Sequence, residues 1–221
     1  MKKAFLLVLL TLAGLTLSAC TPPPPLKSAN YLSDKTLVSQ DPCGPPCFQG
    51  ITVGSTTFSD AVTKLKANAA FSNVQTPDPQ GKPPQAQFNT VKGEAVGQVT
   101  ADAAGVVNAI LVKLAPDVTA GQIIEKYGDP EYVTGVDYSQ EEVALALIFP
   151  KIGLVAWVTP GDANGTLQKS NPVVVALYLA PGDFPKLLET ATLKIWTGYQ
   201  PYKTYASATA VVTPKITVTP Q

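Results

Sequence analysis

Two segments of the chain have the apolar spacing of an amphipathic helix. In the first, Phe58, Ala61 and Leu65 recur three or four residues apart, which places them on one face of a helix. Thr57 stands just before them and supplies the side-chain oxygen that is preferred at a helix N-cap. The pattern predicts a helix over residues 58–68.

The second helical segment follows Thr119. Gln122 lies three residues after this threonine, at the position that completes a capping box. Gly128 and Pro130 then stop the helix, because glycine favours the C-terminal cap and proline cannot continue the turn. A third, shorter helix is predicted after Asp183.

Apolar and β-branched runs between these helices predict the strands of an antiparallel sheet. They lie in two groups, at 86–91, 94–100 and 106–114, and at 131–137, 142–149, 153–159 and 172–179. The runs 143–149 and 173–179 are apolar at nearly every position, so we expect them near the sheet centre and covered on both faces. The proline-rich stretch 76–86 is interpreted as an exposed connection.

The order of elements, one helix and then about three strands, occurs twice. The halves 48–115 and 116–195 would place their strands in one sheet with the helices packed on one face, which is an α+β fold. We expect one folded domain over residues 48–205. The tail at 206–221 lacks apolar periodicity and is expected to be disordered.

The N-terminus has a different pattern. Lys2 and Lys3 precede an apolar run that ends in Leu17-Ser18-Ala19-Cys20, and this gives the basic, apolar and small-residue regions of an export signal. The run is shorter than the ~20 apolar residues that span a bilayer. We interpret residues 1–19 as a signal peptide.

The four residues Leu17-Ser18-Ala19-Cys20 resemble the lipobox of bacterial lipoproteins. The resemblance implies cleavage before Cys20, diacylglycerol on its thiol and an additional acyl chain such as palmitate. Such a protein stays on the cell membrane or the outer envelope surface, extracytoplasmic, because each buried methylene contributes ~0.8 kcal/mol. Residues 20–47 would form a lipidated, proline-rich tether. The alternative is ordinary signal cleavage, although that prefers a small residue where bulky Leu17 stands.

Lipid on Cys20 leaves Cys43 and Cys47 as a pair in an oxidising compartment, where a disulfide is the default. An extended polyproline conformation would separate the two cysteines by about 12 Å at ~3.1 Å per residue, whereas a disulfide needs Cα atoms within ~7 Å. Gly44 must therefore turn the chain. A two-thiolate metal site is the alternative, but the sequence contains no histidine and no further free cysteine to complete it.

Composition and charge exclude several classes of partner. Without Lys2 and Lys3, 14 lysines face 16 acidic residues, a formal charge of −2. The basic residues are all lysine and do not cluster, so the bidentate arginine fork of phosphate recognition is missing. We expect no nucleic acid partner.

The absence of histidine also removes Ser-His-Asp and Cys-His catalysis. Two acidic pairs remain, Asp129 with Glu131 and Glu141 with Glu142, and we interpret both as solvated carboxylates. The segment 162–165 has the first residues of a calcium loop without its twelfth-position glutamate. A turn explains it. We predict no catalytic residue, no metal and no cofactor.

Aromatic residues recur every three positions near the C-terminal end, at Trp196, Tyr199, Tyr202 and Tyr205. In a polyproline conformation they would share one face. Exposed rings there would form a contact surface for a sugar or a protein partner. The interpretation that we favour is that the rings are buried across the domain, because large aromatic side chains are mostly buried.

Two further motifs carry a resemblance to known folds. The matching residues are Gly54-Ser55-Thr56-Thr57, Val62 and Leu65 at the start of the first half, and Tyr127-Gly128-Asp129-Pro130 with Tyr132-Val133 in the second. They resemble the repeat of the β-lactamase-inhibitor-protein-like fold and of the small barrel-assembly lipoprotein family. The first half lacks Gly-x-Pro, and Asp117-Val118-Thr119 replaces the opening glycine of the second. The resemblance implies a domain without catalysis that acts through protein contacts.

We therefore expect a membrane-tethered, extracytoplasmic lipoprotein that acts as a non-enzymatic protein-interaction domain at the cell envelope, with an envelope protein as its partner. A small-ligand or carbohydrate-binding lipoprotein is the alternative.

Overall fold

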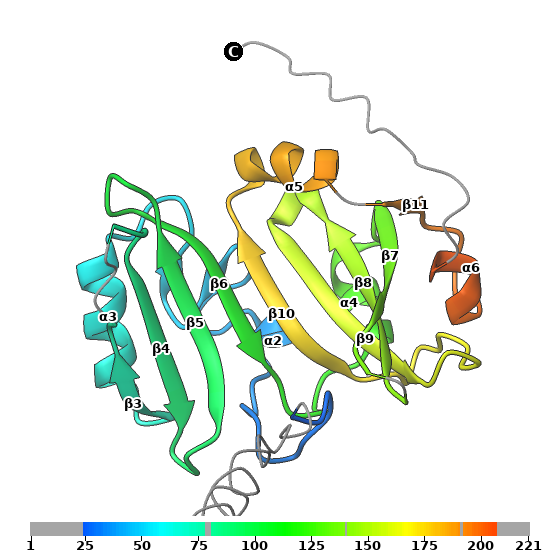
Figure 1. Cartoon of the computed structure of the whole chain (residues 1–221), viewed down its shortest axis with the longest axis horizontal. Coiled ribbons are helices and arrows are strands. Elements are labelled where there is room, and N and C mark those ends of the chain that lie inside the picture. The colour runs from blue at the N-terminus through cyan, green and yellow to red at the C-terminus, as the bar shows by residue number, and fades with distance from the viewer. Residues whose placement is uncertain (1–23, 78–80, 140, 191, 207–221) are drawn as a thin grey trace, which may run out of the picture.

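The structure is a computed structural model that describes residues 24–77, 81–139, 141–190 and 192–206 (Figure 1). The predicted signal peptide, Cys20 and the tail from residue 207 lie outside this range. Among the described residues, no helix is long and apolar enough to cross a bilayer.

The predicted duplication is present, and each half is one helix followed by four strands. The elements of the first half are α3 (Phe58–Ala67), β3 (Phe71–Gln75), β4 (Gln85–Thr90), β5 (Ala95–Ala101) and β6 (Val107–Lys113). Those of the second are α4 (Ala120–Tyr127), β7 (Tyr132–Asp137), β8 (Val143–Phe149), β9 (Leu154–Gly161) and β10 (Val173–Leu179). Strand β3 was not predicted, so the expectation of about three strands in the first half is corrected to four.

Within the described residues these strands and the short β11 (Lys194–Ile195) form a nine-stranded sheet in the order β11-β7-β8-β9-β10-β6-β5-β4-β3. Neighbouring strands are antiparallel throughout. The last strand of each half, β6 and β10, meet at the junction of the halves (Figure 1). The α+β fold is confirmed.

Each half caps the start of its helix in the same way. Thr57 and Thr119 are the N-caps, and their side chains accept hydrogen bonds from the amides of Asp60 and Gln122. In α4 the Gln122 side chain also accepts from the Thr119 amide, which completes the predicted capping box. Because the caps satisfy amides at the first turn, both helices begin where the sequence pattern places them.

In both halves, the first residue of the helix forms a backbone hydrogen bond with the loop before the fourth strand. The Phe58 amide donates to the Gly105 carbonyl at 2.8 Å, and the Ala120 amide donates to the Asn171 carbonyl at 2.9 Å. These matched bonds show that the halves repeat one structural unit, although their sequences differ.

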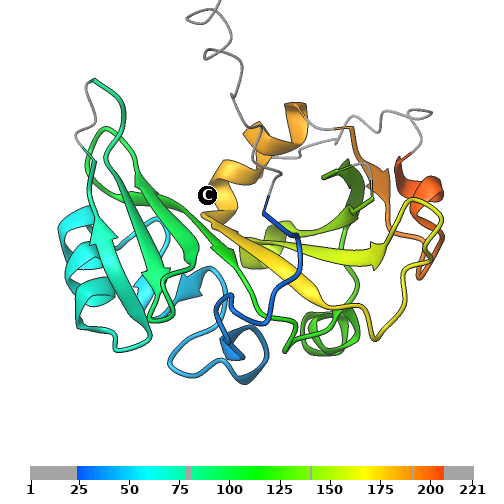
Figure 2. The same cartoon turned by 60° about the horizontal axis from the view of Figure 1, so that its bottom comes forward.

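Both faces of the sheet are covered in the second half. Along β8, Leu145 and Leu147 join the main core with α3 and α4, while Ala146 and Ile148 face the opposite side. Helix α5 (Phe184–Thr190) covers that opposite side (Figure 2). The all-apolar strands are therefore central and covered on both faces, as predicted. The expectation that all helices pack on one face is wrong for α5, because the outer face of β8 and β9 is itself apolar and needs a cover.

The main core centres on Phe48, which is fully buried in a short hairpin of β1 (Cys47–Phe48) and β2 (Ile51–Thr52). Its ring contacts the rings of Phe71, Phe88 and Tyr178 at centroid distances of 5.6 to 6.3 Å. Phe88 and Tyr178 come from different halves, so this aromatic cluster joins the two repeats.

The described part of the expected tether is packed onto the folded body. Leu32 and Leu37 are buried in the main core, and Leu26 is buried against Ala144 and Val174 on the outer face. The Ala115 amide donates to the Leu32 carbonyl at 2.8 Å. The predicted start of the folded domain at residue 48 is therefore wrong. Burial of these leucines stabilises the packed segment more than their exposure to water in a tether would. The short helix α2 (Thr36–Ser39) belongs to the same segment.

Candidate functional site

Cys43 and Cys47 form the predicted disulfide, with Cα atoms 5.7 Å apart. The chain turns between them, since the Cys47 amide donates to the Gly44 carbonyl at 3.0 Å. The two sulfur atoms are bonded to each other and are not free to act as metal-binding thiolates. The loop also contacts the second half, where Pro46 lies against Gly153.

The aromatic residues proposed as a contact surface are mostly internal. Tyr202 and Tyr205 are each 3% exposed, and Trp196 and Tyr199 are half-buried. The Tyr205 ring stacks on Trp196 with centroids 6.0 Å apart. Tyr202 and Tyr205 lie on helix α6 (Tyr202–Ala206), not in a polyproline segment, and their rings face the core. The exposed-surface interpretation is therefore wrong for these two tyrosines.

Hydrogen bonds account for the polar ends of both buried tyrosines. The Tyr202 hydroxyl donates to Asp137 Oδ1 at 2.7 Å, and the Tyr205 hydroxyl donates to the Gly198 carbonyl at 2.7 Å. Burial, followed by the bond to Asp137, raises the pKa of Tyr202 above its ordinary value. Tyr202 and Tyr205 therefore complete the main core.

The two acidic pairs are in different settings. Glu142 accepts a hydrogen bond from the Leu26 amide at 3.0 Å and thereby holds the N-terminal segment. Asp129 and Glu131 are exposed and stand at the edge of a pocket. In the segment 162–165, the Asn164 amide donates to Asp162 Oδ1 at 2.7 Å, as in the predicted turn.

The outer face of the first half carries polar side chains and has no covering helix among the described residues. It contains Gln85, Gln87, Gln98, Thr100, Asn108, Leu111 and Lys113, and we call this set the amide face. The side chains pair across strands, with Gln98 Nε2 donating to Gln85 Oε1 at 3.0 Å. A shallow groove of about 180 Å³ crosses it beside Leu111.

The corresponding face of the second half is apolar and covered. Val155 and Ile148 lie beneath Phe184 and Leu188 of α5. The two halves therefore share one fold but differ in what covers the outer side of the sheet.

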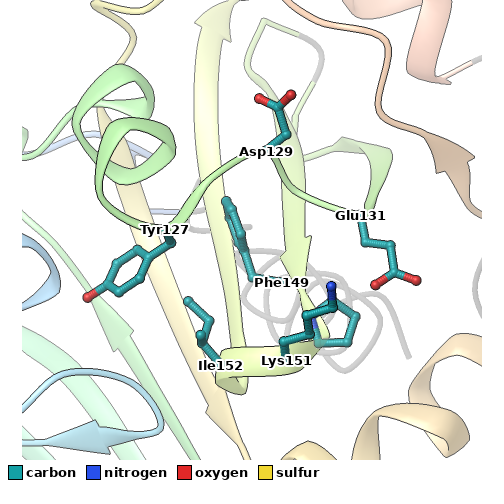
Figure 3. Close-up of a pocket in the computed structure, with 7 residues that line it drawn as sticks. Tyr127, Asp129, Glu131, Phe149, Lys151 and Ile152 are labelled. Atoms are coloured by element: carbon teal, nitrogen blue, oxygen red, sulfur yellow. The ribbon is translucent and has the colours of Figure 1, made fainter.

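A pocket of about 390 Å³ lies between the end of α4 and the turn from β8 to β9 (Figure 3). That turn is the 3₁₀ helix η1 (Pro150–Ile152). Phe149 and Ile152 supply apolar surface, Tyr127 stands to one side, and Glu131 and Lys151 stand to the other (Figure 3). No local signal in the sequence marks these residues as one site.

The walls of the pocket are fixed by contacts outside it. The Tyr127 hydroxyl donates to the Leu37 carbonyl at 2.7 Å, and burial raises the pKa of Tyr127. Gly153 ends the turn with φ of +69°, and a Cβ there would meet the Leu179 carbonyl oxygen at 2.2 Å. Only glycine fits that position. The pocket is thus formed in advance of any ligand.

The charges of the pocket are only partly used within the structure, where burial, followed by the interaction of the Tyr132 hydroxyl with the Glu131 carboxylate, raises the pKa of Tyr132. Lys186 and Asp183 form an ion pair on and beside α5, and Lys151 forms none within 4 Å among the described residues. Lys151, Asp129 and Glu131 are exposed. Their charges are therefore accessible to a ligand.

The sequence matches no protein-family model and no curated protein. Among solved structures, it is similar to the crystal structure of a DUF4309 family protein (YjgB) from Bacillus subtilis subsp. subtilis str. 168, at 13% sequence identity. The likeness covers 59% of this chain and 83% of that chain, with a TM-score of 0.32. A similarity of this size carries no argument about function.

Proposed function

We propose that the mature protein is a lipid-tethered, non-enzymatic domain that binds another protein at the cell envelope through its amide face. The observation that carries the proposal is the difference between the halves: one outer face is apolar and capped by α5, while the equivalent face is polar and open. A polar outer face is also stable in water without a cover, so the difference between the halves supports a binding role only together with the chemistry of this face.

The chemistry of the amide face suits a protein partner. Glutamine, asparagine and threonine side chains donate and accept hydrogen bonds without the desolvation cost of a full charge. Leu111 adds an apolar contact, and it is 39% exposed. Lys113 lies 5.4 Å from the centre of the Tyr31 ring, which holds this cation at the edge of the face. Aromatic stacking platforms of the kind that favour a sugar are absent from the set.

The position of the N-terminal segment suits a partner at the membrane. Leu26 is buried on the same side of the sheet as the amide face. Leu26 is six positions after Cys20, and an extended chain of that length reaches about 20 Å. If Cys20 carries lipid, the amide face is held close to the bilayer. We therefore propose the extracytoplasmic part of a membrane-bound protein as the partner.

Site-specific photo-crosslinking in intact cells tests the function. A photoreactive residue at Gln87 or at Leu111 should capture the same membrane-bound protein, identified by mass spectrometry, whereas one at exposed Lys66 on α3 should not. The substitution Gln98→Arg should abolish capture, and the purified partner should bind the purified lipoprotein. Equal capture from Lys66, or none from the amide face, contradicts the proposal.

The anchor is tested separately. Mass spectrometry of the mature N-terminus should find an acylated Cys20, and Cys20→Ser should release the protein from the membrane fraction. An unmodified Cys20 or cleavage at another bond would remove the membrane part of the proposal and leave the amide face to be judged by binding alone.

A further inference from the structure

We propose that the pocket between α4 and the β8–β9 turn binds a small zwitterion, namely an amino acid or short peptide with an apolar side chain. This site is separate from the amide face, so the inference does not rest on the proposed function. It adds a small-molecule ligand to a domain that the proposed function describes through a protein partner.

Opposite charges line one end of the pocket. Figure 3 shows Tyr127 on one side of Phe149 and the side chains of Glu131 and Lys151 on the other. An α-amino acid carries its ammonium and its carboxylate on the same carbon, and the pocket has a carboxylate and an ammonium at the same end. Glu131 would accept from the ligand ammonium, and Lys151 would donate to the ligand carboxylate. Asp129 points away from this end (Figure 3).

Apolar side chains lie beside these charges. Phe149 and Ile152 line the pocket, and the Phe149 ring stands between Tyr127 and the charged end (Figure 3). Phe149 belongs to the main core and is only 5% exposed, so the fold fixes its position and a small part of its ring forms a rigid piece of the pocket wall. An aliphatic or aromatic side chain would cover this surface and gain from its burial.

The pocket is small, and its walls are held in place. A volume of about 390 Å³ is at the small end of the ~300–1,000 Å³ range of ligand sites, which suits an amino acid or dipeptide and not a larger metabolite. Because Tyr127 is held by Leu37 and the turn is held at Gly153, binding does not have to order the walls.

Calorimetric titration of the mature full-length lipoprotein in lipid nanodiscs tests the inference. The probes are L-phenylalanine, N-acetyl-L-phenylalanine, L-phenylalanine amide and L-alanyl-L-phenylalanine. We expect the zwitterions to bind, and the acetylated and amidated forms to bind about tenfold more weakly, since each loses one charge-assisted hydrogen bond. A preference between free amino acid and dipeptide identifies the source of the zwitterion.

Two substitutions assign the charges. Lys151→Gln should weaken L-phenylalanine binding about tenfold and leave binding of the amide unchanged. Glu131→Gln should weaken L-phenylalanine equally and leave binding of the acetylated form unchanged. The matched controls are Lys126→Gln and Glu189→Gln, which make the same charge changes at exposed positions outside the pocket.

Three outcomes overturn the inference. They are the absence of binding by any probe, equal binding of the charged and neutralised probes, and an equal loss of binding in the control variants. None of them affects the photo-crosslinking result at the amide face, so failure here is distinguishable from failure of the proposed function.

Discussion

Leu111 on β6 lies directly opposite Leu177 on β10, at the seam where the two halves of the sheet meet. The two leucines hold the same place in their repeats, and both point to the outer side. Leu177 packs into the cluster beneath α5 with Phe184 and Leu188. Leu111 stays 39% exposed. This pair marks the line at which the covered outer face ends and the amide face begins.

The leucine pair predicts unequal costs for the same truncation. Leu177→Ala should lower the free energy of unfolding by about 2 kcal/mol, because it removes a side chain packed against the α5 cluster. Leu111→Ala should cost less than about 1 kcal/mol, because its side chain is partly in water already. Urea unfolding of both variants measures the difference. Equal costs would mean that α5 does not cover the sheet as described.

The sequence predicts those parts of the fold that local pattern controls. Thr57 and Thr119 begin the helices because capping oxygen and apolar spacing agree there. Strand β3 is not predictable in this way. Asn73 adopts a positive φ of 49° and the pairing with β4 shifts register nearby, so the apolar and polar residues of this strand do not alternate.

The N-terminal segment shows the limit of composition as a guide. Leu26, Leu32 and Leu37 are isolated among prolines and polar residues, and that composition is typical of a tether. Each is buried by residues distant in sequence, for example Leu32 beside Leu114. A local pattern does not contain that information.

The candidate sites also depend on contacts that a local sequence pattern does not contain. A spacing of three residues fits a polyproline helix and also one face of an α-helix, so Tyr202 and Tyr205 are equally compatible with both. The pocket forms because β7 pairs with β8, where the Glu131 amide donates to the Ile148 carbonyl at 2.9 Å. Sheet register of this kind brings Glu131 and Lys151 into the lining of one pocket, and no motif in the sequence marks it.

Gly97 is predicted to tolerate no side chain. A Cβ at this position would lie 1.9 Å from the Phe88 ring. Gly97→Ala should therefore destabilise the protein by about 1–3 kcal/mol through overpacking. Gly182→Ala is the matched control, because nothing lies within 4 Å of its added methyl group, and it should be close to neutral. The double variant Gly97→Ala/Phe88→Leu should lose less unfolding free energy than the sum of the losses in the two single variants. Simple additivity in thermal or urea unfolding would contradict the contact.

The two helix caps should contribute similar amounts to the free energy of unfolding. Thr57→Ala and Thr119→Ala each remove a side-chain acceptor of a first-turn amide, and each should cost about 1 kcal/mol of unfolding free energy. Thr63→Ala, at an exposed position inside α3, replaces a β-branched residue by a better helix former and should be neutral or slightly stabilising. A loss at Thr63 as large as at Thr57 would show that the caps have no special role.

The disulfide closes a short loop, and the length of this loop determines how much the bond is expected to add to the free energy of unfolding. Cys43 and Cys47 are four residues apart, and the loop-entropy relation gives about 2 kcal/mol for a loop of this length. The double variant Cys43→Ser/Cys47→Ser should lose about that amount, and reductant should lower the wild type to the same level without affecting the variant. Alkylation of both thiols in the unreduced wild type would rule out the bond.

Alkaline pH should unfold the protein through buried tyrosines. Tyr178 is 1% exposed, and burial, followed by the nearby Asp34 carboxylate, raises its pKa well above the ordinary value of 10.0. Burial and the Asp137 hydrogen bond likewise raise the pKa of Tyr202. Above about pH 10 the unfolded chain loses these protons while the folded chain keeps them, so the folded state binds more protons and stability falls as pH rises. Below about pH 10 both states are protonated, and the tyrosines make no difference to the pH dependence.

Two substitutions separate the hydroxyl groups. The Tyr178 hydroxyl makes no hydrogen bond of good geometry among the described residues, and the neighbouring Thr36 side chain only partly offsets the rise in its pKa. Tyr178→Phe should therefore keep or slightly raise stability at pH 7 and should make the alkaline loss shallower. Tyr202→Phe breaks the 2.7 Å bond to Asp137 and should cost about 1 kcal/mol at pH 7, while it also reduces the alkaline loss. Urea unfolding at pH 7, 9, 10 and 11 measures both effects. If Tyr178→Phe destabilises the protein at pH 7 as much as Tyr202→Phe, the Tyr178 hydroxyl is hydrogen-bonded. If Tyr178→Phe leaves the alkaline loss unchanged, the ionisation of Tyr178 is not its cause.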